Sequence, residues 1–226
     1  MAAGVERRRL PREVREQQML DAAVEVFSEH GFHAASMEQI AERARVSKPL
    51  LYLYLGSKEE TLRACIARES DRLVDAIGVA TRAEAADDAE RLWRGLTAFF
   101  TYVSARRASW VVLYQQARSH DGPVAEQLAR VRRDIVSTVA ELVLRAMSAS
   151  SPQGDGPGYA TVRREAAAVA HALVGAADAM ADWAVTNPSE APQTTARRLM
   201  NLMWIGMERR AQGDRFLPPD GRTPAA

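Results

Sequence analysis

Two lysines, Lys48 and Lys58, flank an apolar run of leucine and tyrosine, and every other basic residue of the chain is arginine. An ammonium group can bind a DNA phosphate or the edge of a base, so this segment could contact nucleic acid. The same two lysines could instead be the solvated ends of a buried segment. The elements that carry them decide between these two interpretations.

Side chains suited to catalysis or metal binding are not grouped in known motifs. The sequence has no Gly-x-Ser-x-Gly elbow, no phosphate-binding glycine loop and no His-Glu-x-x-His pair. Its four histidines do not form a ligand cluster in the sequence. We therefore expect no catalytic residue, no metal ion and no cofactor, with an enzyme kept as an alternative.

The composition is that of an ordinary globular protein, with 226 residues, 47% of them hydrophobic and 26% charged. The single cysteine excludes an internal disulfide framework and suits a reducing cytoplasm, where we expect the protein to act. The sequence contains no run of about 18 apolar residues, which is the length that could cross a membrane. The net charge is only +1, so a DNA-binding surface would require positive charge to be segregated onto one face.

Helix-capping signals surround the two lysines. Ser36 and Gln39 have the spacing of a capping box, and the segment Ser57–Glu60 repeats it. Ser47 can cap a helix with Pro49 in its first turn, where the missing proline N–H costs nothing. The expected helices here cover about residues 13–30, 37–44 and 58–83, plus a short one after Ser47.

A helix, a three-residue turn and a second helix within residues 36–55 predict a helix-turn-helix, whose second helix enters the major groove of DNA. Its apolar positions should pack the two helices together and onto the preceding helix. These positions are Met37, Ile40, Ala41, Val46 and Leu51.

The remainder of the chain also reads as helical. Helices are expected over about residues 87–106, 109–120, 123–148, 161–185 and 192–212, with a loop at 148–158 that is rich in Ser, Pro and Gly. The sequence therefore predicts an all-α protein.

Over about residues 13–66 the sequence resembles the TetR/AcrR family of bacterial transcriptional regulators. The residues that carry the resemblance share one register: Ala22, Ala23, Phe27, Ile40, Ala41, Val46, Ser47, Leu51, Tyr52, Tyr54, Leu55, Ser57, Lys58 and Glu59. Three positions depart from the family pattern. Arg45 stands where glycine is usual, Leu50 replaces a small or hydroxylated residue, and Leu55 replaces phenylalanine.

The resemblance implies two domains. An N-terminal three-helix DNA-binding domain with its helix-turn-helix would cover residues 13–57, after a flexible basic arm at residues 1–12. A larger C-terminal helical domain for ligand binding and dimerisation would cover residues 58–212, followed by a loose tail at residues 213–226.

The resemblance also implies DNA contacts. Ser36 and the amides behind it would bind a backbone phosphate. The groove would be faced by Lys48, Pro49, Leu50 and Tyr52, with Leu50 limited to a thymine methyl. Tyr52 and Tyr54 are candidates for phosphate contacts, and Lys58 would bind on the other side of the groove. Either tyrosine could instead be a core residue.

Aromatic side chains gather on the expected helices 87–106 and 109–120 and could line a pocket for an apolar ligand. The candidate ligand-binding residues are Trp93, Phe100, Trp110, Tyr114, His171, Asp178 and Met180. The alternative for each aromatic residue is ordinary bundle core, and the His171–Asp178 pair could be structural or exposed.

The last two helices resemble the dimer interface of the family. A small-residue face for close packing is offered by Ala166, Ala170, Leu173, Val174, Ala177 and Ala181. The partner helix carries Leu199, Leu202, Met203 and Met207. We expect a homodimeric repressor that binds a palindromic DNA operator and is released by a small, largely apolar ligand. A helical protein-interaction module is the other alternative, and repressor is not separated from activator.

Overall fold

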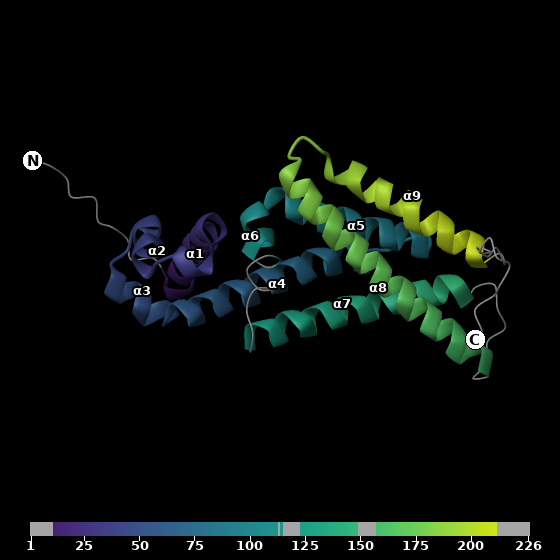
Figure 1. Ribbon diagram of the computed structural model, residues 1–226, viewed down its shortest axis with the longest axis horizontal. Helices are drawn as coiled ribbons and strands as arrows, with labels where there is room; N and C mark the ends of the chain where they lie inside the picture. Colours follow the sequence, from purple (N-terminus) through teal and green to yellow (C-terminus); the bar gives the residue numbers. More distant parts are fainter. Residues whose placement is uncertain (1–10, 113, 115–122, 149–156, 212–226) are drawn as a thin grey trace, which may run out of the picture. The chain divides into compact units, whose positions relative to one another are not determined.

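The computed structural model describes residues 11–112, 114, 123–148 and 157–211, and within these ranges it is built of helices alone (Figure 1). The all-α prediction is confirmed. Residues 1–10 of the expected arm, part of the expected helix 109–120, most of the expected loop and the tail lie outside the described residues. The helices are α1 (Arg12–Ala34), α2 (Met37–Ala44), α3 (Lys48–Leu55), α4 (Lys58–Arg82), α5 (Asp88–Ala105), α6 (Arg107–Val111), α7 (Pro123–Ser148), α8 (Pro157–Thr186) and α9 (Pro192–Ala211).

The chain divides into two compact units. The first unit holds Met1–Arg72 and Arg106–Val131, and the second holds Leu73–Ala105 and Arg132–Ala226. The first half of α4 thus groups with the DNA-binding helices, whereas the sequence placed the boundary at residue 57. The physical reason is burial, because this half of α4 carries Cys65 at 0% exposure, 3.8 Å from the carbonyl oxygen of Leu20 on α1.

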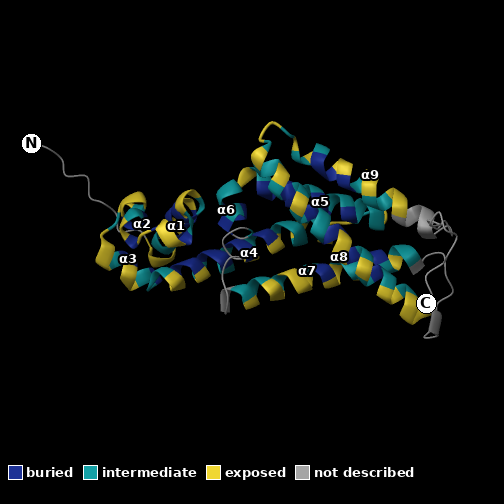
Figure 2. Cartoon of the chain, in the orientation of Figure 1, coloured by how far each residue is buried: buried dark blue, intermediate teal, exposed yellow. Residues whose placement is uncertain are grey.

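The first unit has a core shared by its opening helices. Helix α1 packs against α2, α3 and α6, and α2 packs against α3. Burial follows the apolar periodicity of each helix, and the dark stripes of Figure 2 show it. Fully buried side chains of this core are Met19, Phe27, Ile40, Leu51, Leu62 and Ile66.

Glycine ends the regular part of α1. Gly31 has φ 73° and ψ 164°, a conformation that L-residues rarely adopt, and it kinks the chain before the last turn of this helix. The expected stop at Gly31 therefore coincides with a break in α1, although residues 32–34 add one more turn.

In the second unit, α5 packs against α8 and α9, and α8 packs against α9. Gly95 lets α4 and α5 approach, because a Cβ at this position would lie 3.0 Å from Cγ2 of Thr81. Part of the core joins α7 to α8 through Val136, Ala170 and Val174.

The small-residue face expected to form the dimer interface is interior instead. Ala166, Ala170, Leu173, Val174, Ala177 and Ala181 are all buried within the chain itself, as is Leu199 on α9. These seven residues therefore belong to the subunit core, whereas Leu202 of the same expected set is 70% exposed and Met203 is half-buried. The side chain of Met207 lies outside the described residues. The periodicity correctly marked an apolar face of α8, but it could not tell which element covers that face.

No described helix is both long enough and apolar enough to cross a membrane.

Candidate nucleic-acid interface

Helix α2 begins with a complete capping box. The backbone N–H of Gln39 donates to Oγ of Ser36 at 3.2 Å, and the backbone N–H of Ser36 donates to Oε1 of Gln39 at 2.8 Å. This confirms the sequence prediction for the cap. Ser36 is exposed at the positive end of the helix dipole, where an anion is favoured. The phosphate contact of Ser36 itself stays a prediction.

The turn of the helix-turn-helix passes through Arg45. Its backbone is left-handed, with φ 55° and ψ 43°, and its N–H donates to the carbonyl oxygens of Ala41 and Glu42. The next N–H, from Val46, donates to the Ala41 oxygen at 3.0 Å. These bonds close α2 with a conformation that glycine adopts at less cost than arginine.

Helix α3 begins as expected at its proline but differs at its cap. Pro49 lies in the first turn, where its missing N–H leaves no helical bond unmade. Ser47 is the N-cap residue, yet its side chain makes no capping hydrogen bond, so that part of the expectation was wrong. The Ser47 carbonyl still accepts the first helical bond, from Leu51 at 3.1 Å.

One face of α3 is buried and the other is exposed. Leu51 and Leu55 face the core of the first unit, one helical turn apart. Lys48, Pro49 and Tyr52 lie on the exposed side, with Tyr52 46% exposed, and Leu50 is half-buried.

Sequence reasoning missed Leu53 on this exposed side. Its side chain is 72% exposed, more than that of Tyr52. The signal was present, because burial of Leu51 and Leu55 turns position 53 away from the core. An exposed leucine on a groove-facing helix can contact the methyl group of thymine.

Tyr54 is half-buried rather than free. The guanidinium of Arg12 lies over its ring, 5.3 Å from the centroid, so α3 contacts the start of α1. A phosphate contact by Tyr54 stays a prediction.

The charged side chains around α2 differ in how strongly they are engaged. Arg43 donates to Glu25 at 2.9 Å and to Glu29 at 2.7 Å, which ties α2 to α1. These bonds raise the pKa of Arg43 and lower the pKa of Glu29 below 4.5, the latter chiefly through the hydrogen bond from Arg43. Lys48 has a looser contact with Glu38 at 3.6 Å between two exposed groups. Such a pair contributes little and can exchange for a phosphate.

Lys58 is held by the end of α1. Its ammonium group donates to the carbonyl oxygens of Phe32 at 2.9 Å, His33 at 3.3 Å and Ala35 at 3.0 Å. The same nitrogen lies 4.6 Å from the centroid of the Phe32 ring. Lys58 thus fixes the segment that leads into Ser36. A direct contact between Lys58 and DNA stays a prediction.

The turn between α3 and α4 depends on Gly56 and a second capping box. Gly56 has φ 71°, and a Cβ there would clash with the carboxylate of Glu60. The Ser57 backbone N–H donates to Oε2 of Glu60 at 2.7 Å, and the Glu60 N–H donates to Oγ of Ser57 at 3.2 Å. The predicted cap is confirmed. The bond from the Ser57 N–H lowers the pKa of Glu60 below 4.5.

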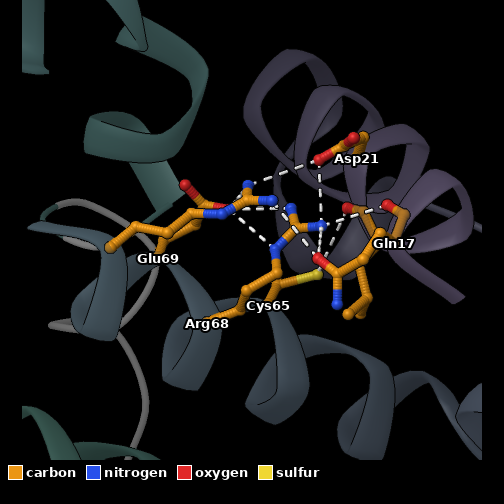
Figure 3. Close-up of polar contacts among 7 residues, drawn as sticks. Gln17, Asp21, Cys65, Arg68 and Glu69 are labelled. Atoms are coloured by element: carbon orange, nitrogen blue, oxygen red, sulfur yellow. Dashed lines mark hydrogen bonds and ion pairs between the residues drawn. The ribbon is translucent and has the colours of Figure 1, made fainter. Parts of the chain in front are cut away.

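A cluster of ion pairs joins α1 to α4 within the first unit, and Figure 3 shows it. We name Gln17, Asp21, Arg68, Glu69 and Arg72 the α1–α4 cluster. Arg68 donates to Asp21 at 2.9 Å, to Glu69 at 2.7 Å and to the Gln17 carbonyl at 3.1 Å. Arg72 donates to Glu69 at 2.9 Å and to Oε1 of Gln17 at 3.2 Å. Glu69 is completely buried, so its charge is balanced by these two guanidinium groups.

Cys65 lies beside this cluster and is unreactive by its surroundings. Burial raises the pKa of its thiol to about 12, which keeps it protonated near neutral pH.

The candidate ligand residues fall in both units. Phe100 is buried on α5 in the second unit, and Trp93 on the same helix is half-buried. Trp110 and Tyr114 belong to the first unit, where their rings stack with centroids 4.9 Å apart. The structure thus brings Trp110 and Tyr114 together, and their role in ligand binding stays a prediction.

The candidates on α8 have different surroundings. Asp178 forms an ion pair with Arg132 of α7, whereas His171, two turns earlier, is exposed. Met180 is half-buried. The Arg132 pair supports the structural alternative for Asp178. Among the described residues, no group of three or more His, Cys, Asp or Glu side chains could hold a metal ion.

Comparison with protein families identifies both parts of the chain. Residues 19–65 match the family described as bacterial regulatory proteins, tetR family, and residues 89–206 match the tetracyclin repressor-like C-terminal domain. The chain belongs to the TetR family. It is therefore a DNA-binding transcriptional regulator with a helix-turn-helix, and the family does not consist of enzymes.

Individual TetR-family relatives agree with this assignment. The transcriptional activator FasR of Mycolicibacterium smegmatis is 37% identical over 145 residues, which cover 63% of this chain and 66% of FasR, just under two thirds. A TetR-like regulator from Rhodococcus sp. RHA1 is 40% identical, with a TM-score of 0.73 over 88% of this chain and 98% of that one. FadR of Bacillus subtilis, solved in complex with stearoyl-CoA, shares the fold at 17% identity and a TM-score of 0.67, over 83% of this chain and 96% of that one.

Proposed function

We propose that this TetR-family regulator reads its operator with the exposed face of α3. The observation that carries the proposal is the arrangement of this helix, in which Leu51 and Leu55 anchor it while Tyr52 and Leu53 project to solvent. In a helix-turn-helix this second helix lies in the major groove. Lys48 at its start would bind a guanine edge or a phosphate, and Pro49 and Leu50 would face the bases.

The Tyr52→Ala variant tests this interface. Operator DNA is first selected from random duplexes with the wild-type protein, and footprinting then compares wild type with the variant. We expect protection to be lost, while unfolding shifts by less than about 0.5 kcal/mol because the side chain is exposed. The matched control is Tyr159→Ala, an exposed tyrosine of α8, which should footprint normally. Normal protection by Tyr52→Ala would contradict the assignment of α3.

We further propose that the effector is an acyl-coenzyme A thioester, which sharpens the expectation of a largely apolar ligand. Two observations support this class. FadR of Bacillus subtilis was solved with stearoyl-CoA, and α5 offers an apolar interior with Phe99 and Phe100 packed edge to face at 5.0 Å. An effector acts by binding the DNA-competent and DNA-incompetent conformations with different affinities.

Operator affinity measured with stearoyl-CoA, free coenzyme A and stearate separates the parts of this ligand. We expect only the thioester to change the affinity by tenfold or more, within the usual range of coupling between two sites. A decrease would identify a repressor that the ligand releases, as the sequence suggests. An increase would identify an activator-like response, in keeping with the name of FasR. An unchanged affinity would contradict the ligand class.

We propose a homodimer that places two α3 helices on a palindrome, through a face that differs on α8 from the one the sequence indicated but keeps Leu202 of α9. A stripe of small residues runs along the exposed side of α8 and ends at Trp183, which is 43% exposed. Helix α9 adds Leu202 and Ile205, exposed by 70% and 49%. Exposed large apolar residues on these two helices are suited to burial against another subunit. The stripe on α8 consists of the exposed residues Ala168, Ala172 and Ala179 and the half-buried Gly175.

Gly175 offers a sharp test of this dimer. A Cβ at this position meets no atom within 4 Å, so a side chain can start here without a clash at its first carbon. The unfolding midpoint of Gly175→Leu is measured beside its oligomeric state and should stay near that of wild type. In a closely packed dimer the same side chain would separate the two α8 helices. We expect light scattering to show a monomer for Gly175→Leu and a dimer for the Gly175→Ala control. A dimer of wild-type strength for Gly175→Leu would exclude this face.

The alternative of a helical protein-interaction module predicts no salt-dependent binding to DNA. Salt-dependent binding in the measurements above would therefore exclude this alternative, and its absence would support it. We place the regulator in the bacterial cytoplasm, where its operator lies.

A further inference from the structure

Arg45 occupies a backbone conformation that favours glycine. Within the described part of the chain it is the one non-glycine residue with a positive φ, at 55°. Its N–H is held by Ala41 and Glu42, so the turn itself imposes the conformation. An arginine side chain makes this turn less stable than glycine would. This cost raises the question of what the arginine side chain contributes outside the turn.

The Arg45 side chain contributes nothing visible to the fold. It is exposed and forms no hydrogen bond or ion pair with the described residues. The neighbouring cations are engaged, since Arg43 pairs with two carboxylates of α1 and Lys48 contacts Glu38. Lys58 donates to three carbonyl oxygens. Within the described part of the chain, Arg45 is therefore a positive charge of the helix-turn-helix that no carboxylate pairs with.

Its position is next to the helix that reads DNA. Arg45 lies two residues before Ser47, the N-cap of α3, and the start of α3 carries Lys48 and Pro49, for which we proposed contacts in the groove. A groove-bound helix has the DNA backbone alongside its N-terminus, within the reach of a long side chain. A guanidinium binds a phosphate through two parallel hydrogen bonds.

We propose that Arg45 is a phosphate-contacting residue that contributes to operator affinity without contributing to sequence choice. The inference rests on the proposed role of α3 and adds a residue that the recognition helix does not contain. The contact between Arg45 and a phosphate offsets the free-energy cost of the left-handed turn only when DNA is bound. It follows that one substitution should move stability and DNA affinity in opposite directions.

Three substitutions separate backbone from charge. Arg45→Gly relieves the turn and removes the charge, Arg45→Ala removes the charge alone, and Arg45→Lys keeps the charge on the strained backbone. We expect Arg45→Gly to raise the unfolding midpoint by about 2–4 °C, with the other two variants near wild type. Arg45→Gly and Arg45→Ala should both bind DNA about five- to tenfold more weakly, and Arg45→Lys should lie between them and wild type.

Fluorescence anisotropy with the selected operator and with a random duplex of equal length, at several salt concentrations, measures these effects. The loss should be equal on both duplexes, and the salt slope should fall by about 0.9 for Arg45→Gly and Arg45→Ala. Wild-type affinity and slope in both variants would overturn the role of Arg45. Tyr52→Ala, measured in parallel, keeps the two proposals apart. If it loses operator binding while the Arg45 variants do not, only the Arg45 inference fails, and if it binds normally, α3 itself is misassigned.

Discussion

Two groups of cations in the DNA-binding unit illustrate opposite uses of the same charge. Arg68 and Arg72 surround the buried carboxylate of Glu69 and join α4 to α1. Arg45 and Lys48 lie on the exposed side of the helix-turn-helix. Among the described residues Arg45 has no ionic partner, and Lys48 has only a loose contact with Glu38. The first group is neutralised inside the fold and the second remains available for an external anion.

This difference explains how a chain with a net charge of only +1 can bind DNA. The positive charge is not more abundant in the N-terminal part but is sorted by burial and pairing. Carboxylates such as Glu25, Glu29 and Glu69 neutralise the arginines that hold helices together, which leaves the turn before α3 positive. A local field of this kind attracts DNA without a strongly basic protein.

The largest effect that this comparison predicts comes from Glu69. Glu69→Ala leaves Arg68, whose side chain is only 10% exposed, without its buried partner. Breaking a buried pair from one side costs about 3 kcal/mol or more, because the remaining buried guanidinium keeps only the exposed carboxylate of Asp21 as its ionic partner. We expect chemical denaturation to show a loss of about 3 kcal/mol in the free energy of unfolding.

Asp71→Ala is the matched control, since Asp71 is an exposed carboxylate two residues further along α4. It should change stability by less than about 0.5 kcal/mol. The salt slope of DNA binding should be unchanged in both variants while they are folded. If Glu69→Ala were as stable as the control, the α1–α4 cluster would not differ from surface charge.

Lys58 shares features with both groups of cations, because it is bonded within the fold and is also a predicted DNA contact. A substitution of Lys58 shows to which group it belongs. Lys58→Met removes three hydrogen bonds to the end of α1, and we expect a loss of about 1–2 kcal/mol in unfolding free energy. Arg63→Met, at an exposed arginine one and a half turns further along α4, is the control and should be nearly neutral.

DNA binding separates the two roles of Lys58. The sequence predicts a direct phosphate contact, whose loss would weaken all duplexes alike and reduce the salt slope by about one. The carbonyl contacts favour a positioning role, in which affinity falls because Ser36 is misplaced but the slope is retained. A reduced slope with full stability would place Lys58 with Arg45 and Lys48 instead.

Features set by neighbours in the sequence were predictable. Both capping boxes, at Ser36 and Ser57, were predicted and found, because each needs only residues three apart. The first turn of α3 was placed by Pro49 for the same reason. The family resemblance was confirmed because many such local positions share one register.

Features that depend on distant partners were not predictable. The α1–α4 cluster joins Gln17 and Asp21 to residues about 50 positions later, and no pattern in the sequence marks that pairing. The three carbonyl contacts of Lys58 are likewise made by backbone that any sequence could supply. The apolar face of α8 was assigned to a second subunit, although α8 buries it within the chain. Periodicity identifies a face, and only packing identifies its partner.

The smallest predicted effect concerns Glu60, an exposed carboxylate that stabilises the fold without being buried. Its pKa lies below 4.5 in the folded chain, because the Ser57 N–H donates to the charged form. This stabilisation is fully present above pH 4.5 and is lost as the pH falls through the lowered pKa.

Glu60→Gln keeps an oxygen that accepts the bond but does not titrate in this range. We expect thermal unfolding midpoints of wild type and Glu60→Gln to differ slightly at pH 7 and to converge as the pH falls toward 3. Glu59→Gln, the exposed neighbour, should show no such convergence beyond that of the helix dipole. A difference between wild type and Glu60→Gln that stayed constant with pH would mean that the cap depends on the shape of the side chain and not on its charge.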